Sequence, residues 1–173
     1  MTTMVPFKRI LLCYDGTSEG RAALQCGGAL VQLLHAEAHL LAVLDYAYWA
    51  RGFDVLSAVG FDLSEQAVQE VLREGVDKLR RLDVVATGHT LFGNPVDGIP
   101  RLANTVEADL IVIGHRRESV FSRWWTGENH ALLLDRVACD VLFEVAATPP
   151  GLARPKEDAG RHPPRPSTWS YRR

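Results

Sequence analysis

The 173-residue chain has no apolar run that approaches the roughly 18–20 residues of a membrane-spanning helix. Its first sixteen residues also lack the layout of a secretory signal peptide, because their apolar run is short and directly follows Lys8 and Arg9. Three cysteines, odd in number and scattered among apolar neighbours, do not form the pattern of a disulfide framework. We therefore expect a cytoplasmic protein with inert, reduced thiols and no membrane partner.

Three motifs of α/β proteins are missing as well. The turn after the first apolar run reads DGTSEG, so it lacks the G-x-G-x-x-G of a dinucleotide-binding fold. The P-loop sequence G-x-x-x-x-G-K-[ST] is absent. A phospho-receiver domain would need an aspartate at the end of the third strand, where this chain has TGHT at 87–90. These absences exclude the three classes.

Catalytic and metal-binding patterns are equally scarce. No H-E-x-x-H motif or cysteine–histidine pair supports a metal site, so His89, His115 and His130 are interpreted as polar loop residues. Ser119 and Ser122 lack the nucleophile elbow of a hydrolase, and no serine–histidine–aspartate set can be assigned. We expect neither catalytic residues nor a bound metal.

Charge is distributed unevenly along the chain. Residues 148–173 contain six basic and two acidic residues and six of the nine prolines, whereas residues 1–147 contain 13 basic and 19 acidic residues. A basic, proline-rich segment with few aliphatic residues cannot bury enough surface to fold alone. The chain is therefore predicted to form one domain over 1–147 and a disordered tail over 148–173. The net charge of the domain, −6, argues against a nucleic acid partner, which requires a broad positive surface.

What the domain does contain is an alternation of apolar segments and helical patterns. Strands are expected at 8–15, 38–45, 83–90, 108–114 and 140–146. Helices are expected between them, one capped by Thr17 or Ser18, one opened by a capping box of Asp62 and Glu65 and running to about 82, and two at 97–107 and about 128–138. Nearly continuous apolar strands separated by helices predict a doubly wound parallel sheet with helices on both faces.

In such sheets, ligands bind beyond the carboxyl ends of the strands, where the strand order reverses. The turn that begins at Asp15, after the first strand, and Gly114, at the end of the fourth, are the natural pair to flank that crevice. Asp-Gly sequences also form turns without any ligand, so Asp15 has a purely structural alternative role.

Residues 7–146 resemble the universal stress protein family. The segments that carry the resemblance are KRILLCYDGTSEGRAAL near the start, the strand LIVIG, and the loop from Gly114 to Gly127 that leads to DVLFEV. The resemblance implies a five-stranded, Rossmann-like sheet of order 3-2-1-4-5, a homodimer, and a role in stress response or signalling. The resemblance also implies ATP in the crevice, as in many members of the family.

The loop after Gly114 departs from the family's pattern at two positions. ATP-binding members carry G-x-x-G, nine residues, then G-[ST]; the spacing is kept here, but Arg117 replaces the second glycine and Glu128 the hydroxyl residue. An arginine Cβ hinders the close backbone approach that phosphate binding uses. A carboxylate about 4 Å from a phosphate charge repels it by roughly 4 kcal/mol at an effective dielectric of about 20. We expect the phosphate half of the site to be altered.

The base half of the site matches the family better. Asp15 corresponds to the acidic residue near the ribose or adenine, Val43 to an apolar neighbour of the adenine, and Arg116 to an arginine that is frequent in the loop. The predicted nucleotide-binding residues are Asp15, Val43, Gly114, Arg116, Arg117, Gly127, Glu128 and Asn129.

Two alternatives to a partly degenerate nucleotide site remain open. One is a protein-interaction module in which Arg123, Trp124 and Trp125 contact a partner, because two adjacent tryptophans cannot both bury on one regular face. The other is a weak ATPase that uses the same crevice.

The last expected strand also predicts an assembly. Val141, Phe143 and Val145 alternate with Leu142 and Glu144, and the strand is expected at the edge of the sheet. An uncapped edge of this composition is a pairing template. The sequence and the resemblance together predict a homodimer through residues 140–146.

Overall fold

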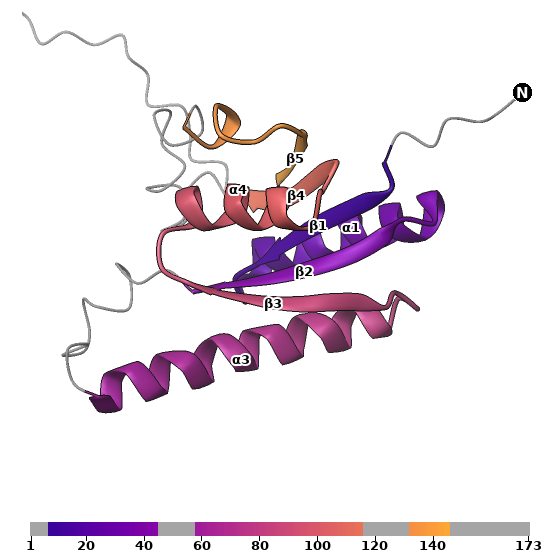
Figure 1. The fold of residues 1–173 in the computed structure, drawn as a ribbon. Coiled ribbons are helices and arrows are strands. Elements are labelled where there is room, and N and C mark those ends of the chain that lie inside the picture. The colour runs from indigo at the N-terminus through magenta and orange to yellow at the C-terminus, as the bar shows by residue number, and fades with distance from the viewer. Residues whose placement is uncertain (1–6, 45–57, 116–131, 146–173) are drawn as a thin grey trace, which may run out of the picture.

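The computed structural model describes residues 7–44, 58–115 and 132–145 (Figure 1). Within these ranges the strands are β1 (Arg9–Tyr14), β2 (Glu37–Leu44), β3 (Ala86–Phe92), β4 (Leu110–His115) and β5 (Asp140–Val145). The helices that connect them are α1 (Ser18–Leu34), α3 (Ala58–Arg80) and α4 (Pro95–Thr105). Of the helix expected at about 128–138, residues 132–138 are described; residues 132–134 are helical and residues 135–138 are not, so the helix ends about four residues earlier than predicted.

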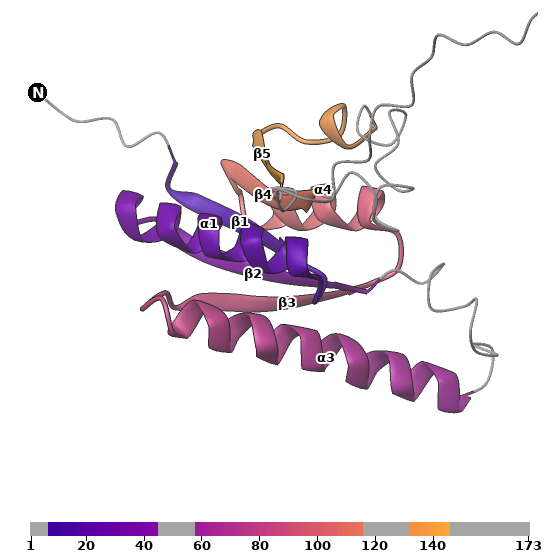
Figure 2. The ribbon, with the colours of Figure 1, turned by 180° about the vertical axis from the view of Figure 1, so that it is seen from behind.

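The five strands form one sheet in the order β3-β2-β1-β4-β5, and each neighbouring pair is parallel. This confirms the predicted fold class and strand order. From β1 the chain moves to β2 and β3 on one side, and it then crosses back over β2 and β1 to β4 on the other side. Because the crossovers are right-handed, α1 and α3 lie on one face of the sheet and α4 on the other. Figures 1 and 2 show this two-sided arrangement, with α4 in front in the first view and α1 in front in the second.

The central strands are apolar throughout because both of their faces are covered. Along β1, Ile10 and Leu12 pack toward α1 and α3, whereas Leu11 and Cys13 pack on the opposite side toward α4. All four are buried, and full burial of each large aliphatic side chain contributes about 1.5–3 kcal/mol. These two clusters fix the sheet at the centre of the domain.

Helix α1 starts as the sequence predicts and lies very close to the sheet. Thr17 is its N-cap, and its hydroxyl oxygen accepts a hydrogen bond from the backbone N–H of Gly20 at 3.0 Å. A Cβ added at Gly27 would lie 2.4 Å from Cδ2 of Leu12, so the glycine lets the helix approach the sheet without displacing this side chain. The helix ends at His35, which adopts a left-handed conformation with φ of 51°.

Two further predicted boundaries differ from the structure by three residues or more. Helix α3 already includes Ala58, so Asp62 lies inside it and the capping box of Asp62 and Glu65 does not open it. The third strand begins at Ala86 and not at residue 83. Asp83 has a positive φ of 53°, and the N–H of Val84 returns to the carbonyl of Leu79 at 3.0 Å, so these residues close the end of α3 before the strand starts.

No helix within the described residues is long and apolar enough to cross a membrane.

Candidate functional site

The carboxyl ends of β1, β2 and β4 meet at one edge of the sheet. There the strand order reverses between β1, which is followed by α1 on one face of the sheet, and β4, which is preceded by α4 on the other face. Ligands bind at this position in open α/β sheets. The crevice at this point is lined by Cys13, Tyr14, Asp15, Gly20, Val43, Ile113 and Gly114. Three predicted site residues, Asp15, Val43 and Gly114, therefore line one crevice.

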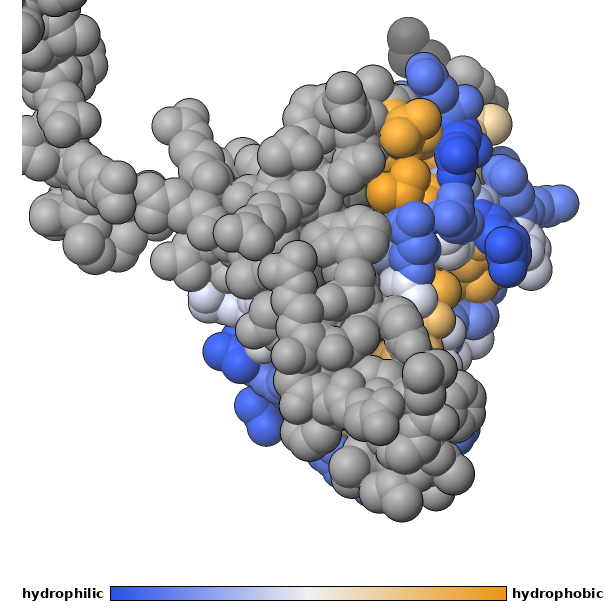
Figure 3. All heavy atoms as spheres, turned by 90° about the vertical axis from the view of Figure 1, so that its left-hand side faces the viewer, coloured by the Kyte–Doolittle hydropathy of each residue, from blue (hydrophilic) through white to orange (hydrophobic). Residues whose placement is uncertain are grey.

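The described part of this crevice is small. Its volume is about 20 Å³, which is room for about one water molecule, so these residues do not enclose a nucleotide by themselves. Figure 3 views the molecule toward this end of the strands, where apolar described residues in orange border hydrophilic ones in blue. The other five predicted nucleotide-binding residues lie outside the described residues, as do Arg123, Trp124 and Trp125 of the predicted interaction surface.

Asp15 is held in place by the turn that it begins. Its Oδ1 accepts hydrogen bonds from the backbone N–H of Thr17 at 3.1 Å and from the hydroxyl of Thr17 at 2.7 Å. A Cβ at Gly20 would lie 2.3 Å from that oxygen, so the absence of a side chain there lets the carboxylate rest on the first turn of α1. The positive end of the helix dipole favours a negative charge at this point. The structural role foreseen for Asp15 is present, and it fixes the carboxylate at the crevice.

Cys13 forms part of the floor of the crevice as a neutral thiol. Burial, and secondarily the charge of Asp15, raise the pKa of Cys13 above its usual range. Burial also raises the pKa of Cys139. Because the thiolate is the nucleophile and the metal ligand, both residues behave as small apolar side chains near neutral pH. This agrees with the expectation of inert thiols.

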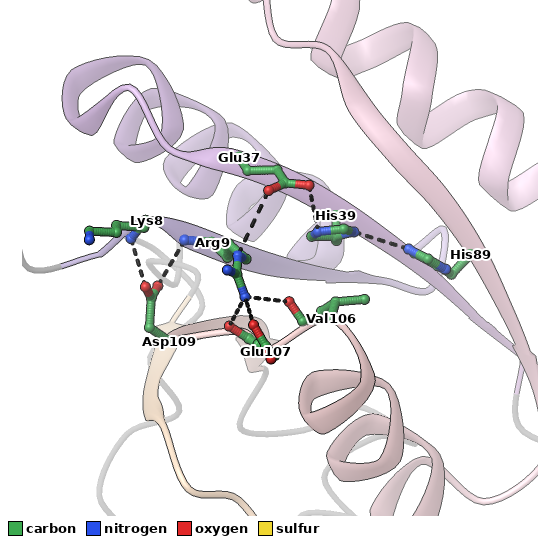
Figure 4. A network of polar contacts seen from close by, with 8 residues as sticks. All are labelled: Lys8, Arg9, Glu37, His39, His89, Val106, Glu107 and Asp109. Atoms are coloured by element: carbon green, nitrogen blue, oxygen red, sulfur yellow. Dashed lines mark hydrogen bonds and ion pairs between the residues drawn. The ribbon is translucent and has the colours of Figure 1, made fainter.

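A second polar group of residues crosses the sheet at the opposite end of β2 (Figure 4). Nδ1 of His39 lies 3.1 Å from Nε2 of His89, and Nε2 of His39 lies 3.3 Å from Oε1 of Glu37. The other oxygen of Glu37 lies 3.9 Å from Nε of Arg9. The cluster Arg9–Glu37–His39–His89 thus joins three neighbouring strands on the face that α4 covers.

Arg9 connects this cluster to the C-terminal end of α4. Its guanidinium donates to the carbonyls of Val106 and Glu107, both at 3.4 Å, and pairs with the carboxylate of Glu107. The hydrogen bond and charge of Glu107 raise the pKa of Arg9. Burial, and then the neighbouring His39, lower the pKa of His89. His89 is therefore mostly neutral near neutral pH.

The comparison with protein families decides the identity of the domain. The model described as the universal stress protein family matches residues 6–143. The chain belongs to the universal stress protein family. Among curated proteins, no sequence matches it.

Several solved structures share the fold of this chain. UspA from Lactobacillus plantarum is 21% identical, with a TM-score of 0.62 over 79% of this chain and 97% of that one. A universal stress protein in complex with cAMP is 19% identical, with a TM-score of 0.58 over 82% and 99%. A family protein from Arabidopsis thaliana with AMP bound is 16% identical, with a TM-score of 0.56 over 82% and 93%. At these identities the similarity shows the fold alone.

In this universal stress protein, the histidines do not lie as the sequence interpretation placed them. His89 is not a loop residue, since it lies within β3 and contacts His39. His115 is the last residue of β4, and His130 lies outside the described residues. The missed signal was the pair Glu37 and His39, two polar residues on one face of an otherwise apolar strand. Within the described ranges, no group of three or more potential ligands could hold a metal ion.

Proposed function

We propose that this universal stress protein binds an adenine nucleoside monophosphate in the crevice at the carboxyl ends of β1, β2 and β4. The convergence of Asp15, Val43 and Gly114 on that crevice carries the proposal. Binding would serve a stress-response or signalling role, as the family membership suggests. ATP is the less favoured ligand, because Arg117 and Glu128 alter the loop positions that hold the outer phosphates in the family's motif.

The floor of the crevice suits a base. Val43 is buried, and Cys13 is a buried neutral thiol, so an adenine ring placed against them would lose contact with water without meeting a charge. Both residues point to the face of the sheet that carries α4, because both belong to the core cluster on that side. The apolar floor therefore lies directly beside the carboxylate of Asp15.

Asp15 suits a ribose. A carboxylate accepts several hydrogen bonds at once, so its bonds from Thr17 do not exclude a further bond from a sugar hydroxyl. Its position is fixed before any ligand arrives, which reduces the entropy lost on binding.

The similar structures agree with a monophosphate ligand. One contains cAMP and another contains AMP, and each of these ligands consists of a base, a ribose and a single phosphate. This is the part of a nucleotide that the matching residues of the present chain would contact.

Calorimetric titration of the full chain with AMP and ATP tests the proposal. We expect micromolar binding of AMP, at least tenfold weaker binding of ATP, and at least tenfold weaker binding of AMP by Asp15→Asn. Asp77→Asn is the matched control, because Asp77 is exposed on α3 and pairs with Arg80; it should bind AMP like the wild type. The proposal fails if AMP does not bind at millimolar concentration, or if both variants bind it equally well.

A further inference from the structure

A larger groove lies away from the nucleotide crevice, between β3 and α4. Its volume is about 420 Å³, within the range of roughly 300–1,000 Å³ that is typical of small-molecule sites. It shares no lining residue with the crevice at the ends of β1 and β4. Nothing in the proposed nucleotide function uses this groove.

The two walls of the groove run antiparallel, and this sets which residues face one another. A Cβ at Gly98 would lie 2.3 Å from Cδ2 of Leu91, so the start of α4 packs closely on the end of β3. A helix rises about 1.5 Å per residue and a strand about 3.3 Å, so about four helical residues match two strand residues. Arg101 and Leu102 on α4 therefore lie at the level of His89 on β3, and all three line the groove.

The chemistry of the lining is apolar with a positive charge. Leu41, Leu91 and Leu102 supply apolar surface, and His89, Arg101 and Thr105 supply polar groups. Among the described residues that line the groove, none is acidic. Arg101 is exposed and forms no ion pair with a carboxylate in the described part of the chain. In a domain whose net charge is negative, this groove is complementary to an anion.

The cluster behind the groove sets the role of His89. The negative charge of Glu37, whose Oε1 lies 3.3 Å from Nε2 of His39, favours the tautomer of His39 that carries its proton on Nε2. In that tautomer Nδ1 of His39 holds a lone pair, which can accept a hydrogen bond from Nε2 of His89, 3.1 Å away. This leaves Nδ1 of neutral His89 as a hydrogen-bond acceptor with no partner among the described residues. A proton taken up at Nδ1 would make the ring a cation that lines the same groove as Arg101.

We propose that this groove binds a small organic carboxylate. Its apolar body would lie on Leu41, Leu91 and Leu102, and its carboxylate would contact Arg101 and the protonated ring of His89. Burial and His39 hold the pKa of His89 low in the free protein, and a bound anion would raise it, so binding takes up a proton. Strand β2 presents two charged or titratable groups to His89, which are His39 and, behind it, Glu37. Helix α4 presents Arg101, and the α3 residues that line the groove, Gln69 and Leu72, are uncharged.

The test uses phenylacetate and its uncharged analogue phenylacetamide as probes of the full chain. In proton–nitrogen correlation spectra at pH 6, phenylacetate should shift the amide signals of Gly88 and Gly98, and saturating AMP should not displace it. Its dissociation constant should be at least tenfold lower than that of phenylacetamide. Equal affinities for the acid and the amide, or shifts confined to Gly16 and Gly114 at the nucleotide crevice, would overturn the proposal.

Variants identify the residues responsible. Arg101→Gln should bring the affinity for phenylacetate within threefold of that for phenylacetamide. Arg81 is an exposed arginine just after α3, so Arg81→Gln should leave both affinities unchanged. Between pH 8 and pH 6 the affinity of the wild type should rise at least threefold, and His89→Gln should remove this rise. Wild-type affinity in Arg101→Gln, or an unchanged pH profile in His89→Gln with a native-like spectrum, would refute the assignment. A failure to bind AMP would leave these outcomes unaffected.

Discussion

The substitution Gly20→Ala tests how the turn at the crevice is built. Gly20 lies in the first turn of α1, and alanine in a helix is usually more stable than glycine by about 0.5–1 kcal/mol. Here the new Cβ would lie 2.3 Å from Oδ1 of Asp15 and 3.1 Å from Cδ2 of Tyr14. The carboxylate must therefore move, and its two hydrogen bonds from Thr17 are weakened or lost.

The expected loss exceeds the gain. A hydrogen bond to a charged group contributes about 1.5–3 kcal/mol, so the net destabilisation should be about 1–2 kcal/mol. For a chain of this size, each kcal/mol changes the melting temperature by about 2–4 °C, which gives a decrease of roughly 2–8 °C. Differential scanning calorimetry measures it, and the affinity for AMP should decrease in the same variant.

A double-mutant cycle separates the clash from other effects. In an Asp15→Ala background the carboxylate is gone and only the milder contact with Tyr14 remains, so Gly20→Ala should stabilise the protein through helix propensity, by at most about 0.5–1 kcal/mol. If Gly20→Ala raises the melting temperature equally in both backgrounds, the close contact between Gly20 and Asp15 does not determine the turn and the reasoning is wrong.

Further predictions concern pH, assembly and the loop. Burial raises the pKa of Cys13 above its usual range and that of Tyr14 to about 12, so both groups keep a proton in the folded protein after the unfolded chain has lost it. The free energy of unfolding should therefore fall between about pH 9 and pH 11 in denaturant titrations, and less steeply in a variant carrying Cys13→Ala. Light scattering should give a dimer mass that Leu142→Pro, in the edge strand β5, reduces to that of a monomer; a monomeric wild type would contradict the predicted interface. The double substitution Arg117→Gly with Glu128→Ser should increase the affinity for ATP more than tenfold in calorimetry, and an unchanged affinity would show that these residues do not weaken the site.

The central strands were predictable because both of their faces are buried. A central strand of a sheet covered on two sides needs a nearly continuous apolar run. The observed bounds of β1 and β2 lie within two residues of the bounds that were predicted from such runs. The edge strand β3 was placed too early for a physical reason. Val84 and Val85 have high strand propensity, yet Val84 closes the end of α3 and Val85 is 91% exposed. Local propensity cannot distinguish a strand from the turn that precedes it.

The two candidate sites were unequally visible in the sequence. Asp15 directly follows one apolar strand, and Gly114 was expected to end another. The general rule for where ligands bind in such sheets was therefore enough to predict that both residues line one crevice. The contact of His39 with His89 joins residues fifty positions apart, and it depends on the register that pairs Leu41 with His89 across two strands. No local spacing encodes that register, although a histidine within a buried strand indicates that a partner is needed.

A crystal structure of the full chain with AMP is the most direct test of the central claim. The account predicts the adenine against Val43 and Cys13, and a ribose hydroxyl within hydrogen-bonding distance of the carboxylate of Asp15. AMP seated instead in the groove between β3 and α4, or a crevice without ligand in crystals grown at saturating AMP, would contradict it.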